Sequence, residues 1–328
     1  MSTPPLSSLA PALIPVIDIG PLRDGSNPMQ VARALHQASR DIGFIYISNH
    51  GIDLNLLADA RQQALEFFRQ PAPIKQALGI SNKHRGFLSM GQARMQADKL
   101  PDLKESFIWG IEDAQGQTEE DHPLRGSNRW PQELPALRAT ALQFFGQADQ
   151  VSRLLLQGFA MGLGLPPEHF LRTCSLPMSR AAFVYYPAQD SQQTTEQFGV
   201  APHTDFGVLT VLCQDDVGGL QVQNAQGQWV NAPPIPGTLV VNVGDLLSRW
   251  TNGEYRSTPH RVINTSGKER LSLVLAFDPD PETRIDAREV FPDREPLEPA
   301  ISCGDYLIWR FGKSFNYRAD ADQPPAAM

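Results

Sequence analysis

The sequence predicts a mixed α+β fold in which helices flank a mainly β core. Short apolar segments rich in β-branched residues alternate with turn residues between positions 208 and 277, which is typical of antiparallel strands. Before that region, apolar residues recur at spacings of three and four, which is typical of helices that bury one face. A chain of 328 residues is long enough to bury a large core.

The amino-terminal part predicts two helices with one strand between them. Helical spacing covers residues 28–40 and again 53–69, where Asp53 is placed to cap the second helix. Residues 41–48 lie between them and have the apolar, β-branched character of a strand. We expect the two helices to pack against that strand.

The middle of the chain predicts one long helix beside the β region. Apolar residues step by three or four from Leu137 to Phe159, and glycine and proline at 162–166 mark the end. The preceding stretch, 113–131, is polar and rich in turn residues. It predicts a solvated loop, with a lid over a pocket as the alternative.

The β region is expected to be a run of antiparallel strands. Its apolar segments are separated by Asn-Ala-Gln-Gly and Pro-Pro-Ile-Pro-Gly, which have the composition of turns. Several short strands in series can carry the chain around a barrel and back. The expected strands are 208–213, 219–223, 228–230, 238–243 and 270–277.

Two histidines and one aspartate have the spacing of a facial metal site. His203 and Asp205 stand two apart, so that on a strand both project toward the same face. His260 follows after several of the predicted strands, which leaves room for the chain to return beside the first pair. Two imidazoles and a carboxylate on one side of an octahedral iron leave the other side free for a chelating co-substrate and dioxygen. A hydrogen-bonded pair without a metal is the alternative.

A second polar pair lies on the predicted strand 270–277. Leu271, Leu273 and their alternates share one face, whereas Arg270 and Ser272 share the other. A guanidinium binds a carboxylate through two parallel hydrogen bonds, and a nearby hydroxyl adds a donor. We therefore expect this pair to hold the far carboxylate of a small diacid, and the implied ligand is 2-oxoglutarate. A buried ion pair is the alternative for Arg270.

Further motifs carry a resemblance to a known family. In the carboxy-terminal half they are Gly218-Gly-Leu-Gln-Val222, Pro236-Gly237, Val241-Asn-Val-Gly-Asp245 and Trp250-Thr-Asn-Gly253. In the amino-terminal part they are Ile14-Pro-Val-Ile-Asp-Ile19, Gly43-Phe44, Asn49-His-Gly51 and Lys104-Glu-Ser-Phe107. Together with the metal trio and the Arg-x-Ser pair, their order resembles the isopenicillin N synthase-like iron(II)/2-oxoglutarate-dependent dioxygenases, of the iron/ascorbate oxidoreductase type. The resemblance covers roughly residues 14–315.

The resemblance implies a double-stranded β-helix, also called a jelly-roll or cupin-like barrel, flanked by helices. It implies a non-haem dioxygenase-type amino-terminal domain at 1–125 (core about 14–125) and a helical scaffold at 126–175. The jelly-roll domain would follow at 176–328 (core about 179–280), with a carboxy-terminal segment. It also implies that Tyr186, which precedes a proline, contacts the co-substrate. Candidates to line a pocket are Arg85, Phe107, Tyr185, Phe206, Phe315 and Tyr317.

The resemblance also implies the reaction and its cofactors. Fe(2+), held by His203, Asp205 and His260, would act with 2-oxoglutarate and O2 to hydroxylate, desaturate or cyclise a small molecule, releasing succinate and CO2. Ascorbate is a candidate reductant. Two alternatives stay open at this point: an isopenicillin N synthase-type oxidase that needs no 2-oxoglutarate, and a metal-binding sensor without turnover. The resemblance leaves the substrate and the regiochemistry open.

Composition indicates a cytoplasmic enzyme without nucleic-acid or membrane partners. The net charge of −8 and pI near 5.4 disfavour binding to phosphate backbones. Three scattered cysteines indicate a reducing compartment, and we see neither a secretory signal nor an apolar run of membrane-spanning length. The sequence leaves the oligomeric state open. We expect the remaining histidines to be structural or solvated (His36, His50, His84, His122 and His169), and Asp215 and Asp216 to be turn residues.

Overall fold

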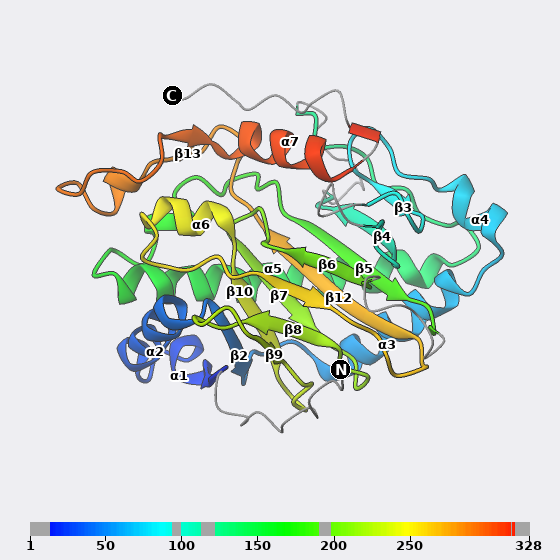
Figure 1. The fold of residues 1–328 in the computed structure, drawn as a ribbon, viewed down its shortest axis with the longest axis horizontal. Coiled ribbons are helices and arrows are strands. Elements are labelled where there is room, and N and C mark those ends of the chain that lie inside the picture. The colour runs from blue at the N-terminus through cyan, green and yellow to red at the C-terminus, as the bar shows by residue number, and fades with distance from the viewer. Residues whose placement is uncertain (1–13, 94–99, 113–121, 190–197, 316, 319–328) are drawn as a thin grey trace, which may run out of the picture.

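The computed structural model describes residues 14–93, 100–112, 122–189, 198–315 and 317–318. Two β-sheets lie face to face in it, one of eight strands and one of four (Figure 1). Apolar side chains of both sheets, among them Tyr46 and Val240 from the large one and Val222 and Val262 from the small one, pack in one cluster. The expected α+β fold with a mainly β, jelly-roll core is confirmed.

The large sheet combines strands from the amino-terminal and carboxy-terminal parts of the chain. Two amino-terminal strands extend one edge and two more extend the other, so the part before residue 125 does not build a sheet of its own. In spatial order the strands are β1 (Val16–Asp18), β2 (Phe44–Ser48), β10 (Leu239–Val243), β7 (Leu209–Cys213), β12 (Arg270–Phe277), β5 (Arg180–Tyr186), β4 (Glu105–Gly110) and β3 (Gly86–Leu88).

The small sheet covers one face of the large sheet. Its order is β6 (Val200–His203), β11 (His260–Val262), β8 (Leu220–Gln223) and β9 (Trp229–Asn231). The pairing of β6 with β11 is antiparallel and places His203 directly opposite His260. A separate two-stranded ribbon joins β13 (Arg284–Ile285) to β14 (Ile301–Ser302).

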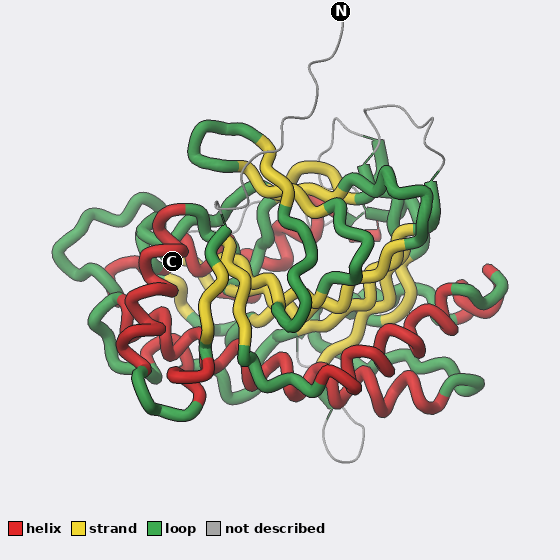
Figure 2. Tube along the Cα trace, turned by 90° about the horizontal axis from the view of Figure 1, so that it is seen from below, coloured by secondary structure: helices red, strands yellow, loops and turns green. Residues whose placement is uncertain are grey.

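Helices cover the other face of the large sheet. Helices α3 (Leu54–Phe68) and α5 (Pro135–Gly162) contact β12, and α2 (Pro28–Asp41) packs against α5. Figure 2 shows long helices running along one side of the strands, below them in this view. The remaining helices are α1 (Gly20–Arg23), α4 (Ala72–Ala77), α6 (Asp245–Trp250) and α7 (Cys303–Ser314), with short 3-10 turns η1 (His169–Leu171) and η2 (Ala287–Glu289).

None of the helices that the structure describes combines the length and the apolar character that crossing a membrane requires.

The predicted elements match the observed ones closely, with one shifted start. Helices α2, α3 and α5 occupy the predicted stretches, and Asp53 caps α3 by accepting a hydrogen bond from the Asn55 amide. The strand predicted over 41–48 begins only at Phe44, because α2 runs through Asp41 and Gly43 then turns with a φ of +67°. The five strands predicted between 208 and 277 are confirmed to within about one residue.

Alternation along β12 gives the sheet one face toward the helices and one toward the space between the sheets. Leu273 is fully buried, with 0% of its surface exposed, whereas Val274 next to it is only partly buried and lines a cavity. We predict that Leu273→Ala lowers the free energy of unfolding by about 2–5 kcal/mol. Val274→Ala, the matched control, is expected to cost about 1 kcal/mol. Urea unfolding curves measure both, and equal losses would contradict this placement.

Candidate metal centre and its cavity

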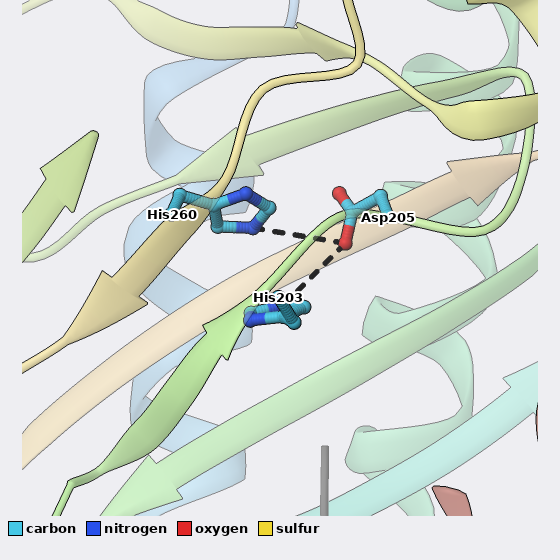
Figure 3. A group of neighbouring side chains, drawn as sticks. All are labelled: His203, Asp205 and His260. Carbon is cyan, nitrogen blue, oxygen red and sulfur yellow. Dashed lines mark ion pairs between the residues drawn. The ribbon is translucent and has the colours of Figure 1, made fainter. Parts of the chain in front are cut away.

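The three side chains with metal-site spacing converge at one end of the small sheet. His203 ends β6, His260 begins β11, and Asp205 follows β6 by two residues. Asp205 Oδ1 lies 3.7 Å from the Nε2 atom of each histidine, and the three ligand atoms lie within 4.8 Å of one another (Figure 3). Among the described residues this is the one such group of three or more His, Cys, Asp or Glu.

The spacing of these atoms fits a single ion bound from one side. Two ligands at about 2.1 Å from an ion lie about 3 Å apart at right angles and about 4.2 Å apart on opposite sides. The observed 3.7 Å falls between these limits. Two nitrogens and one oxygen are the donor set of a facial iron site.

Backbone carbonyls orient both imidazoles. The Nδ1 atom of His203 lies 2.9 Å from the Ala201 carbonyl oxygen, and that of His260 lies 3.2 Å from the Thr258 carbonyl oxygen. A carbonyl can only accept, so each Nδ1 carries the proton and each Nε2 keeps its lone pair. The Phe44 ring packs edge-on against His260, with centroids 5.1 Å apart. Both lone pairs are therefore available to one ion.

The charges of the trio also suit a metal. Burial lowers the pKa of His203 to about 3, and the neighbouring His260 acts in the same direction. Burial opposes ionisation of Asp205, but the two imidazoles and hydrogen bonds from Thr210 and Asn242 outweigh it and lower the pKa of the carboxyl to about 2. At neutral pH His203 is unprotonated and Asp205 is ionised, which are their metal-binding forms.

A network around Asp245 holds the turn between His203 and Asp205. Its carboxylate accepts hydrogen bonds from Thr204 Oγ1 at 3.2 Å and from Ser257 Oγ at 2.6 Å. Tyr306 and Arg310 of α7 bind the same carboxylate. The Asp245 amide also donates to the Asp205 carbonyl oxygen at 2.7 Å. Asp245 lies in the Val241–Asp245 motif, but its role could not be predicted from the sequence, because its partners come from three distant segments.

A cavity of about 210 Å³ between the two sheets joins the metal trio to Arg270. The Arg270 side chain is buried, with Nε donating to the Gly218 carbonyl oxygen at 2.6 Å and Nη1 to Ser272 Oγ at 2.7 Å. Its Nη2 is buried and has no hydrogen-bond partner among the described residues. The guanidinium lies 4.7 Å from the centre of the Tyr186 ring. A buried cationic donor without a partner is costly, so this arrangement fits an anion in the cavity.

Three of the residues expected to line a pocket do not line this cavity, and for two of them, Phe107 and Tyr185, the reason is the same. Side chains alternate along β4 and β5, so that Ser106, Ile108 and Tyr186 face the cavity. Phe107 and Tyr185 therefore point the other way, where Phe107 packs on Phe67 and Tyr185 stacks on Phe68. Arg85 is buried beside Gly110. Phe206 does line the cavity.

The carboxy-terminal candidates lie beside the cavity. Phe315 lines it, and Tyr317 hydrogen-bonds to His84, which lines it too. The cavity is also lined by His84, Lys104 and Arg180, which were not predicted to line it from the sequence. The sequence could have indicated Arg180. It stands an even number of residues before Tyr186 on one strand, so both side chains project toward the same face. The loop predicted over 113–131 lies outside the described residues as far as 121.

Two family models match the chain. One, described as the 2OG-Fe(II) oxygenase superfamily, matches residues 169–279, and one described as the non-haem dioxygenase in morphine synthesis N-terminal matches residues 14–133. A homoarginine-6-hydroxylase of Glycine max is 31% identical over 86% of this chain and 90% of its own length. Validamycin A dioxygenase of Streptomyces hygroscopicus subsp. limoneus is 34% identical over 90% and 85%.

Solved structures resemble the fold over most of its length. A full-length protein of Neurospora crassa, crystallised in complex with alpha-KG, superposes with a TM-score of 0.82 at 29% identity, covering 91% of this chain and 96% of that one. JOX2 in complex with 2OG, Fe and JA superposes with a TM-score of 0.77 at 27% identity, covering 90% and 84%.

The hydrogen bond from Asn242 Nδ2 to Asp205 Oδ2, at 2.8 Å, orients the one carboxylate of the trio. We predict that Asn242→Ala weakens binding of a divalent metal by about 10–100-fold, the usual effect of losing such a support. Titration of the metal-free protein with cobalt(II) or iron(II) measures the affinity. Asn224→Ala, which removes another buried asparagine from the β8–β9 turn, is the control. Unchanged affinity in the Asn242 variant would show that Asp205 needs no such support.

Proposed function

The chain belongs to the 2OG-Fe(II) oxygenase superfamily, and we propose that His203, Asp205 and His260 bind its iron(II) while Arg270, Ser272 and Tyr186 bind 2-oxoglutarate. The enzyme oxidises a small molecule with dioxygen and converts 2-oxoglutarate to succinate and CO2. The comparisons favour this activity over an oxidase without 2-oxoglutarate and over a sensor without turnover.

The observation that carries the residue assignment is the single cavity shared by the trio and by a buried arginine. Its metal end has three converging donor side chains, and its other end has the unpartnered Arg270 Nη2. When bound, iron(II) supplies the redox chemistry that activates dioxygen toward a substrate. The protein contributes position and charge, since the carboxylate and the two imidazoles already converge on one point where the ion would bind.

Arg270 and Ser272 are suited to the far carboxylate of 2-oxoglutarate. Two hydrogen bonds, to Gly218 and Ser272, hold the guanidinium in place, so that Nη2 presents its donors without further ordering. The Ser272 hydroxyl accepts from Arg270 and keeps its own proton to donate. Tyr186 stands opposite Arg270 in register, and its ring packs on the guanidinium. The diacid's keto-acid end would then extend toward the trio.

Two further expectations stay proposals. The division into an amino-terminal part, a helical scaffold and a jelly-roll part is supported by the two family models, which match 14–133 and 169–279. A cytoplasmic location is supported by Cys174, Cys213 and Cys303, which are all unpaired and buried.

Removing one proposed metal ligand at a time tests the metal assignment. His203→Ala or Asp205→Ala is predicted to reduce succinate formation from 2-oxoglutarate to the level without enzyme, because two ligands hold iron(II) poorly. The assay supplies excess iron(II). The affinity of each variant for cobalt(II) is measured in parallel. His36→Ala removes a histidine that bonds to Tyr255 outside the cavity and serves as the control. Turnover near the wild-type rate in either variant would refute the assignment.

Replacing the guanidinium tests the 2-oxoglutarate assignment. Arg270→Lys keeps the charge but loses the paired donors, so we expect the KM for 2-oxoglutarate to rise by about 10–100-fold with a smaller change in kcat. Ser272→Ala is expected to raise the KM less. Arg261→Lys, next to His260 but outside the cavity-lining set, controls for general effects on the barrel. A KM unchanged by Arg270→Lys would place the co-substrate elsewhere.

A further inference from the structure

Strand register divides the cavity floor into rows from one end to the other. A row consists of residues that lie opposite one another in register on adjacent strands of the large sheet. Every residue named in a row below lines the cavity. In order the rows are Tyr186 and Arg270; Ser106, Val184 and Ser272; Ile108, Ala182, Val274 and Leu212; and Arg180, Ala276 and Thr210. The two arginines therefore lie at opposite ends of the floor.

Arg180, which is not assigned to 2-oxoglutarate, lies in the row of the cavity floor that is nearest the metal trio. Arg180 stands on β5, and Thr210 stands two strands away on β7, opposite Asn242, whose amide hydrogen-bonds to Asp205. Neighbouring strands are about 4.8 Å apart, so about 10 Å separates the two backbones. Along β5, six residues, or about 20 Å, separate Arg180 from Tyr186. Arg180 is thus about one small molecule's width from the trio and far from the 2-oxoglutarate end.

One side of the Arg180 guanidinium is bound by the protein, and its other donors face the cavity. Its Nη1 donates to Asp278 Oδ2 at 2.6 Å, and that carboxylate is fully buried, with 0% exposed, and also accepts from the Val208 amide at 3.1 Å. The guanidinium stacks over the Phe311 ring at 4.7 Å. With the described residues, its Nε and Nη2 make no hydrogen bond, and 16% of the side chain is exposed. The cavity therefore meets a fixed cationic edge with unused donors.

The walls around this edge are aromatic rather than acidic. Phe206, Phe311 and Phe315 line this end, and the His84 ring packs on Phe311 and Phe315 with centroids 4.6 and 4.9 Å apart. Burial lowers the pKa of His84 well below its usual range, so its imidazole is neutral. Among the described lining residues the one carboxylate is Asp205, which is a proposed metal ligand. No acid in this lining competes for the free donors of Arg180.

We propose that Arg180 binds a carboxylate of the substrate, whose apolar body packs against Phe206, Phe311 and Phe315 and whose reacting carbon lies at the metal trio. The enzyme's substrates are accordingly small acids with a compact apolar ring or chain. This inference rests on the proposed function, since it takes the trio as the reaction centre and Arg270 as the 2-oxoglutarate site. Lys104 is the other unassigned cation of the lining, and it pairs with the buried Asp102 at 3.3 Å.

Matched acids and amides test the proposal. The probes are benzoate, phenylacetate and cyclohexanecarboxylate, each with its primary amide. They are titrated calorimetrically into the anaerobic enzyme loaded with iron(II) and 2-oxoglutarate. We expect at least one acid to bind, and each acid that binds to do so at least about tenfold more tightly than its amide, because a charged acceptor gains more from the fixed guanidinium.

A paired substitution removes the cation without leaving a buried charge. In Arg180→Gln with Asp278→Asn, the asparagine can still accept from Val208, and neither partner is ionised. The acids are expected to lose about tenfold in affinity, the amides to change less than about twofold, and 2-oxoglutarate to bind as before. Lys104→Met is the control and is expected to keep the preference for acids.

Either of two results would overturn the inference alone: amides that bind as well as acids, or no acid bound at all, in an enzyme that binds iron(II) and 2-oxoglutarate normally. A preference for acids that survives the Arg180 and Asp278 double substitution would also overturn it. Loss of that preference in Lys104→Met instead would assign the carboxylate to Lys104. A wild-type protein that binds neither iron(II) nor 2-oxoglutarate would overturn the proposed function and this inference with it.

Discussion

The pairing of β6 with β11 is the contact on which the rest of the site depends. It sets His203 opposite His260, with ring centroids 4.2 Å apart, although the two lie far apart in sequence. A slip of one residue would turn one imidazole to the outer face of the sheet, because strand side chains alternate. The register shifts between His260 and Val262. A break in register of this kind changes the direction of the side chains beside it, as β-bulges near active sites do.

The two sheets contribute different parts of the site. The small sheet supplies the metal trio at the end of β6 and the start of β11, while the large sheet supplies a floor of side chains from β4, β5, β12 and β7. The helices on the far side of the floor bury the alternate residues, such as Leu273, and keep β12 in place. The positions of Arg270 and Arg180 are therefore consequences of strand register, and the cavity that the trio lines also contains these two fixed cations.

Support for the trio comes from parts of the chain that no local pattern links. Asn242 of β10 holds the Asp205 carboxylate, and Asp245 connects the turn at Thr204 to Tyr306 and Arg310 on α7. The sequence predicted the elements that depend on near neighbours, including α5, β12 and the His-x-Asp pair. It could not predict these contacts, because they depend on tertiary packing. Tyr185 and Phe107 were misplaced as pocket candidates because the alternation that correctly set Arg270 apart from Leu271 was not applied to β5 and β4.

The whole site requires one ion to be bound by atoms from both β6 and β11. The most direct test is diffraction from crystals grown anaerobically with iron(II), with data collected on both sides of the iron absorption edge. We expect one iron peak within about 2.2 Å of His203 Nε2, His260 Nε2 and an Asp205 carboxylate oxygen. An iron peak that lies elsewhere, or that omits any of these three side chains, would contradict this expectation.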